Sequence, residues 1–93
     1  MNNFNLLRSP ADLNKDIANR MRARRKEKKL SQAELSARSD VSLGSLKRFE
    51  SIGEISLSSL IKIAFALGCE DDLDHLFAKK KYTSIREVID EKA

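Results

Sequence analysis

The chain of 93 residues has little of what β-hairpins, disulfides and membrane spans require. It contains one Pro and three Gly, which leaves few positions for tight turns between strands. Its one cysteine, Cys69, cannot form an internal disulfide, which fits a reducing cytoplasm, and we interpret it as a small core residue after a helix. No apolar run approaches 18 residues, and the N-terminus lacks the apolar core of a secretion signal. We therefore expect a cytoplasmic protein without a membrane partner.

The chain also lacks the residues from which most active sites are built. It has one His and one Cys, no nucleophile and base at a useful spacing, and no Gly-rich phosphate loop. Asp71, Asp72 and Asp74 surround His75, but they fall on one short helical pattern without the loop geometry of a cation site. We read them as the solvated acidic start of a helix. We expect no catalytic residue, no cofactor and no metal.

Charge is abundant and unevenly distributed. Residues 1–48 carry 12 Lys and Arg against 5 Asp and Glu, whereas residues 49–93 carry 6 against 9. Seven of the ten residues 20–29 are basic, which suits a polyanion such as nucleic acid or an acidic membrane surface. The absence of aromatics from this block disfavours the membrane, and a merely solvated helix face is the plain alternative. The side chains expected to contact phosphate are Arg20, Arg22, Arg24, Lys28 and Lys29.

Helical periodicity and capping signals predict an all-α fold. Ser9 and Pro10 are typical of an N-cap and first helical position, and a helix is predicted over 10–29, with a candidate break near Asn14. Leu57 to Leu67 follow helical spacing, and because Ile63 and Phe65 widen the apolar face we expect this helix to be central. Gly68 should end it. Residues 71–77 predict a fifth helix, and a capping box at Ser84 predicts a short one near the C-terminus.

Two short helices are predicted back to back, over 31–38 and 42–51. Ser31 and Glu34 form a capping box, and Ser42 begins the second helix after a turn of about three residues. Asp40 is expected to be left-handed, because Asp tolerates that conformation better than most residues. Such a pair is a helix-turn-helix unit, in which the N-terminal end of the second helix enters the major groove of DNA. An ordinary helical hairpin inside an all-α core is the alternative.

The second helix of this unit has an apolar back and a polar front. Val41, Leu46 and Phe49 should hold it against the core. Lys and Arg side chains reach guanine or phosphate, a hydroxyl bonds to base edges, and a glycine lets the backbone approach closely. The residues expected to contact DNA are Gln32, Ser42, Leu43, Gly44, Ser45, Lys47 and Arg48.

From about Ile17 to Gly68 the sequence resembles the Xre/Cro-type helix-turn-helix family. The resemblance is carried by "RMRARRKEKKLSQAEL", "DVSLGSLKRFE" and "SLSSLIKIAFALG". It implies a five-helix lambda-repressor-like domain that represses transcription, usually as a homodimer on two-fold symmetric, double-stranded operator DNA. It also implies a structural ion pair between Arg25 and Glu50. Glycine is common in relatives where this chain has Lys29 and Asp40.

A narrower resemblance is to HipB-like antitoxins, through "LRSPADLNKDIANRMRARRKEKKLSQ" at residues 7–32 and "VSLGSLKRFE" at residues 41–50. It implies an autoregulatory antitoxin whose partner is a HipA-like serine/threonine kinase toxin. A regulator without a toxin, and a module that mainly binds a toxin, remain alternatives. We divide the chain into a flexible arm (1–8), a DNA-binding domain (9–78) and a C-terminal extension (79–93) that serves a dimer or a partner. The candidate dimer contacts are Leu73, Leu76, Phe77, Tyr82, Ile85, Val88 and Ile89.

Overall fold

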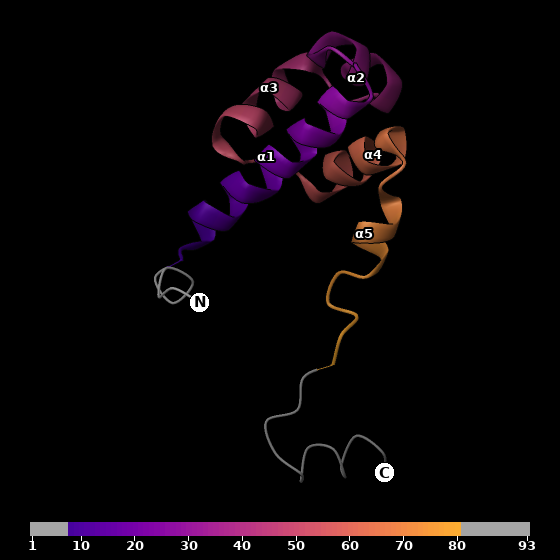
Figure 1. The fold of residues 1–93 in the computed structure, drawn as a ribbon. Coiled ribbons are helices and arrows are strands. Elements are labelled where there is room, and N and C mark those ends of the chain that lie inside the picture. The colour runs from indigo at the N-terminus through magenta and orange to yellow at the C-terminus, as the bar shows by residue number, and fades with distance from the viewer. Residues whose placement is uncertain (1–7, 81–93) are drawn as a thin grey trace, which may run out of the picture.

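Five helices and no strand make up residues 8–80, the part of the chain that the computed structural model describes (Figure 1). They are α1 (Pro10–Glu27), α2 (Gln32–Ser39), α3 (Leu43–Ile52), α4 (Leu57–Leu67) and α5 (Glu70–Asp74). α1 packs against α3, and α4 packs against α2 and α5. The predicted all-α, five-helix architecture is confirmed. The predicted arm up to residue 7 and the helix near Ser84 lie outside the described residues.

α1 begins as predicted, runs without a break and ends at Glu27, two residues before the predicted end. Ser9 caps it, and Asp12 completes a capping box that the sequence patterns had not included. The candidate break at Asn14 is wrong. Asn14 instead packs against Gly53, where an added Cβ would come within 2.7 Å of the Asn14 carbonyl carbon. Gly53 adopts a positive φ of 79° as the C-cap of α3, so only glycine suits both the conformation and the contact.

The core is small and lies where α1, α2, α3 and α4 meet. Leu35, Leu46 and Ile63 are fully buried at its centre. Its other buried members are Ala18, Met21, Leu30, Val41, Phe49 and Leu67. Cys69 packs against this core but is only half-buried, so it is a peripheral member of the core rather than a buried one.

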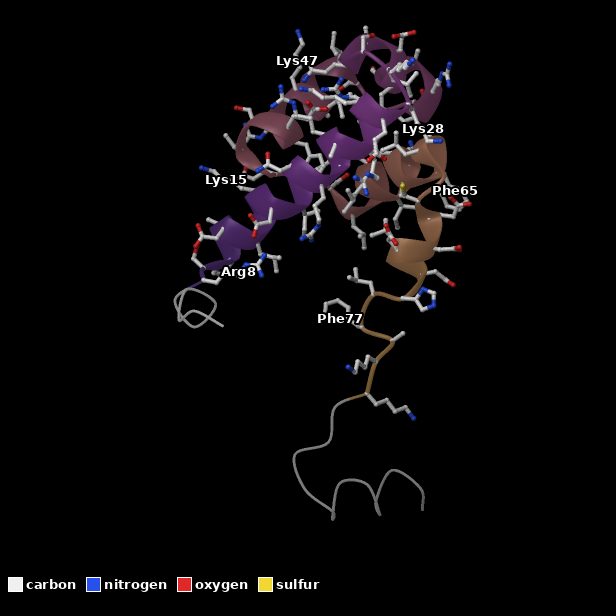
Figure 2. All side chains as sticks on the ribbon, in the orientation of Figure 1. Arg8, Lys15, Lys28, Lys47, Phe65 and Phe77 are labelled. Carbon is white, nitrogen blue, oxygen red and sulfur yellow. The ribbon has the colours of Figure 1, made fainter. Side chains whose placement is uncertain are left out.

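Two predictions about the last helices are wrong. α4 was expected to be central; Ile63 and Leu67 do belong to the core, but Phe65, which was expected to widen the apolar face, is exposed, as are Leu57 and Ile61. α5 ends at Asp74, three residues before the predicted end, and the chain continues in turns. Leu73 is half-buried, but Phe77 is 96% exposed and stands clear of the helices (Figure 2).

Residues 8–80 contain neither a helix suited to cross a membrane nor a cluster suited to bind a metal. No helix there is both long enough and apolar enough to cross a bilayer. Within the same residues, no three His, Cys, Asp or Glu side chains gather closely enough to hold a metal ion.

Candidate nucleic-acid interface

Serine side chains cap the start of α2 and hold the turn between α2 and α3. Ser31 accepts from the Glu34 N–H at 3.0 Å, and the Glu34 carboxylate accepts from the Ser31 N–H at 2.8 Å, so α2 begins with the predicted capping box. Ser36 donates its hydroxyl proton to the Val41 carbonyl, and the Val41 N–H donates to Ser39 at 3.3 Å. Both bonds cross the turn from α2 to the residue that precedes the α3 cap.

Asp40 turns the chain with a left-handed conformation, as predicted. Its φ and ψ are 59° and 32°. Lys29, in the connection between α1 and α2, also has a positive φ of 58°. The two positions where relatives often carry glycine therefore keep the left-handed geometry without glycine. Asp tolerates the left-handed conformation better than Lys, because its short polar side chain can form hydrogen bonds with the nearby backbone.

α3 has the buried back that was expected. Leu46 and Phe49 on α3, with Val41 before it, are all buried in the core. The opposite side carries exposed residues, namely Ser42, Gly44, Ser45, Lys47 and Arg48. Leu43 differs from expectation because it is half-buried. It shares a helical stripe with Leu46 and Glu50, at spacings of three and seven, and this stripe turns toward α1 rather than outward.

The first turn of α3 is organised by two hydroxyl groups. Ser42 accepts from the Ser45 N–H at 3.1 Å and donates its proton to the Ser45 hydroxyl oxygen at 2.8 Å. Ser42 is thus both the N-cap and a partner that orients Ser45. Gly44, between them, has no atom within 4 Å of an added Cβ. This turn therefore presents bare backbone and a positioned hydroxyl to its surroundings.

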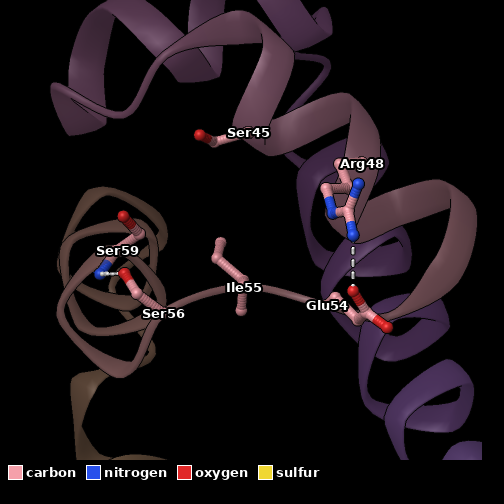
Figure 3. Close-up of a pocket in the computed structure, with 6 residues that line it drawn as sticks. All are labelled: Ser45, Arg48, Glu54, Ile55, Ser56 and Ser59. Carbon is pink, nitrogen blue, oxygen red and sulfur yellow. Dashed lines mark hydrogen bonds and ion pairs between the residues drawn. The ribbon is translucent and has the colours of Figure 1, made fainter.

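Arg48 is paired with a carboxylate that the sequence patterns did not reveal. Its Nη2 lies 2.7 Å from Oε1 of Glu54, in the loop after α3, and both side chains are more than half exposed (Figure 3). The pair borders an open hollow of about 410 Å³ between α3 and the start of α4. The residues that line this hollow are Ser45, Arg48, Glu54, Ile55, Ser56 and Ser59.

Arg25 and Glu50 form the ion pair that the resemblance implies. Arg25 Nε lies 2.7 Å from Oε2 of Glu50 and Nη2 lies 2.8 Å from Oε1, so the pair is bidentate. The third guanidinium nitrogen donates to the Leu30 carbonyl at 2.8 Å. Both side chains are more than 90% buried, and the hydrogen bonds with Glu50 raise the pKa of Arg25 above its usual value, although burial opposes this. The pair joins α1 to the end of α3 and thereby orients α3.

Gln32 and Arg22 extend this network toward the surface. Gln32 Nε2 donates to Oε1 of Glu50 at 3.1 Å, and Arg22 Nε lies 3.7 Å from the same oxygen. Gln32 is therefore half-buried and held by Glu50, whereas the sequence predicted a side chain that contacts DNA. Its position beside α3 follows from the carboxylate that also binds Arg25.

The basic block of residues 20–29 does not form a single patch. Residues four apart share a helix face and residues two apart lie on opposite faces. Arg20 and Arg24 accordingly line a hollow whose other walls include Leu60 and Leu73, and Arg24 pairs with Glu27 at 2.7 Å. Arg22 lies on the other side, beside Glu50. Lys28 and Lys29 are exposed past the end of α1 (Lys28 is labelled in Figure 2).

Comparison with known proteins agrees with this geometry. A family model described as helix-turn-helix, of the Xre/Cro type, matches residues 21–73, which is more than half of the chain and includes all of α2, α3 and α4. No curated protein sequence matches the chain closely enough to count as a relative. With a matched domain of this extent and a turn of this geometry, the chain belongs to the Xre/Cro-type helix-turn-helix family of DNA-binding domains.

Proposed function

We propose that this protein is a sequence-specific repressor that places the N-terminal half of α3 in the major groove of operator DNA. The observation that carries the proposal is the division of α3 into two sides. Leu46 and Phe49 anchor one side in the core, while Lys47 and Arg48 are exposed on the other. A major groove about 12 Å wide admits one such helix.

The exposed residues of α3 suit different parts of a duplex. Arg48 reaches a guanine or a phosphate, and Lys47 acts as a point charge toward phosphate. The Ser45 hydroxyl, held by Ser42, can bond to a base edge. Gly44 lets the first turn come close to the sugar–phosphate backbone. Leu43 is half-buried, so only the exposed part of its side chain can contact a thymine methyl group.

Phosphate binding falls to residues around this helix. Gln32, at the first position of α2, lies beside backbone N–H groups that favour an anion. Arg22, Lys28 and Lys29 extend the cationic surface at the end of α1, whereas Arg20 and Arg24 lie on the side toward α4 and α5. We expect binding to weaken strongly with salt, because each neutralised phosphate releases counterions.

The test is a DNA titration with the promoter region of the protein's own gene. Arg48→Ala and Lys47→Ala are expected to weaken binding at least tenfold each, in line with the loss of about 1–3 kcal/mol per good base or phosphate contact. Lys15→Ala is the matched control, because Lys15 is an exposed cation on α1 remote from Lys47 (Figure 2). If all three variants bind like the wild type, α3 is not the recognition helix.

Repression by a homodimer is part of the same proposal. Helix-turn-helix dimers read two half-sites about one helical turn apart, so two copies of α3 must face the same side of the duplex. A footprint with two protected half-sites related by two-fold symmetry is the expected result. Protection of a single half-site would remove the dimer from the proposal.

The narrower version makes the protein the autoregulatory antitoxin of a HipA-like kinase. It is supported only by the resemblance of residues 7–32 and 41–50. Co-purification with the product of the neighbouring gene tests it. If no kinase-like gene lies next to this one, a regulator without a toxin is favoured, and if the complex forms but the promoter is not bound, the protein is mainly a toxin-binding module.

A further inference from the structure

One face of α4 is more apolar than a free surface usually is. Leu57, Ile61 and Phe65 follow one another at intervals of four residues, so they form a row along the helix. Their exposed fractions are 61%, 37% and 64%. Single exposed apolar residues are ordinary, but a contiguous row on one helix marks an interaction surface. Figure 2 shows Phe65 projecting outward from α4.

A hollow of about 280 Å³ lies beside this row, between α4 and α5. Ile61, Ala64 and Phe65 form its α4 wall. Its α5 wall consists of Leu73 and three acidic residues, Glu70, Asp71 and Asp74. Oε1 of Glu70 is buried and receives no hydrogen bond from any group in residues 8–80. The hollow thus offers apolar walls, an acidic border and one carboxylate oxygen without a donor.

The two borders of the row carry opposite charges. α5, with its acidic residues, lies on the side of Ala64. Lys62 is one position past Ile61 and therefore lies about 100° around the helix, on the opposite border. A surface with cations on one border and anions on the other is complementary to itself when a two-fold axis runs along the row. In that arrangement the Lys62 border of each copy meets the acidic border of the other.

We propose that the α4 face, defined as Leu57, Ile61, Phe65 and the α5 border, is where a second copy of this chain docks. The two α4 helices then run side by side and parallel about a two-fold axis. Phe65 of each copy packs at the hollow of the other, and Lys62 supplies a cation to Glu70 or Asp71 across the interface. Of the dimer contacts expected from the sequence, only Leu73 borders this face. Leu76 and Phe77 follow α5, and the remaining four, Tyr82, Ile85, Val88 and Ile89, lie outside the described residues.

The position of α3 agrees with this axis. Ser56 and Ser59, at the start of α4, share a hollow with Ser45 and Arg48 of α3. Figure 3 shows α4 seen nearly end-on at this hollow, with α3 crossing beside it. An axis along α4 therefore leaves both copies of α3 at the same end of the dimer. The docking proposal uses the homodimer of the proposed function but does not depend on DNA binding.

Sedimentation of the full chain without DNA, over a range of concentrations, tests the proposal. The wild type is expected to dimerise, and Phe65→Ser is expected to raise the dimer Kd at least about tenfold, because buried aromatic side chains dominate interface energetics. Phe77→Ser is the matched control, since it makes the same change at a still more exposed phenylalanine, and should leave the Kd within about twofold. Circular dichroism verifies that both variants keep their helices.

A charge exchange tests the orientation of the two copies. Lys62→Glu and Asp71→Lys are each expected to raise the dimer Kd, and the double variant should bring it back toward the wild-type value. The proposal is overturned if the wild type stays monomeric at every concentration, which would leave residues 81–93 or another protein as the occupant. It is also overturned if Phe77→Ser dissociates the dimer while Phe65→Ser does not. Arg48→Ala should dimerise normally, so failure of DNA binding and failure of docking are read separately.

Discussion

Arg48 and Glu54 form an ion pair at the edge of the surface that faces outward from α3, with 2.7 Å between Nη2 and Oε1. Because both side chains are more than half exposed, the pair is worth at most about 1 kcal/mol. Arg48 can therefore exchange this contact for one with DNA. The effect of the pair is to position the Arg48 guanidinium at the edge of α3. A carboxylate at this place also repels phosphate.

We predict that Glu54→Gln binds unrelated DNA more tightly and discriminates the operator less well. Removing the negative charge lowers the repulsion from phosphate at every sequence, while Arg48 loses the partner that orients it. Fluorescence anisotropy with operator and scrambled duplexes measures both affinities. Thermal unfolding should change little. Weaker binding to both duplexes would show that Glu54 itself contacts DNA.

Gly44→Ala separates the needs of the fold from those of the interface. An added Cβ meets no atom within 4 Å, and alanine is favoured over glycine in a helix by about 1 kcal/mol, although less in the first turn. We expect the variant to be as stable as the wild type or slightly more so in urea denaturation. If the backbone approaches DNA at Gly44, operator affinity falls severalfold. Unchanged affinity would place that turn away from the duplex.

Glu50→Gln should be strongly destabilising, although it changes few atoms. It leaves the buried Arg25 guanidinium without its anion and weakens the anchor of Gln32. Breaking a buried pair from one side costs about 3–5 kcal/mol, and urea denaturation measures it. The double variant Arg25→Met, Glu50→Met should lose less stability than Arg25→Met or Glu50→Met alone, because it leaves no unpaired buried charge. A loss below about 1 kcal/mol for Glu50→Gln would mean that the pair contributes little to holding α3 against α1.

The capping carboxylates predict how stability varies with acid. Hydrogen bonds from the backbone and side chain of Ser31 lower the pKa of Glu34 below its usual 4.5, and those from Ser9 lower the pKa of Asp12 below 3.8. A lowered folded-state pKa contributes stability that is full above the usual value and is lost as pH falls through the folded value. Melting temperature should therefore drop as pH decreases below about 4.5.

Glu34→Gln provides the control for this pH dependence. Glutamine at the third position can still close the capping box but does not titrate. At pH 3 the variant should have a melting temperature near that of the wild type. Between about pH 5 and pH 3, the range in which ordinary carboxyl groups titrate, its melting temperature should fall less steeply. An identical pH profile would mean that Glu34 contributes nothing to acid unfolding.

The starts of α1, α2 and α3 and the turn before α3 could be predicted from the sequence. The caps at Ser9, Ser31 and Ser42 and the left-handed Asp40 are confirmed, because each depends on one residue and its near neighbours along the chain. These caps mark where successive helices begin, and so they predict the order of the helices along the chain. The Arg25–Glu50 contact is long-range and entered only through the resemblance.

Tertiary approach and the choice of exposed face were not predictable. Arg48 meets Glu54 only because Gly53 turns the chain against Asn14, which no spacing encodes. Phe65 was expected to widen the apolar face of a central helix but is exposed, because periodicity cannot tell an apolar side chain that meets the core from one that faces outward. The basic block likewise spreads around α1, because its density along the chain says nothing of its division among faces.

The most direct measurement is an NMR titration of the ¹⁵N-labelled chain with a duplex from its own promoter. We expect the largest amide shifts at Gln32 and at residues 42–48, where α2 and α3 begin. Shifts concentrated on α5 or on the Arg20 side of α1, with residues 42–48 unmoved, would contradict this expectation.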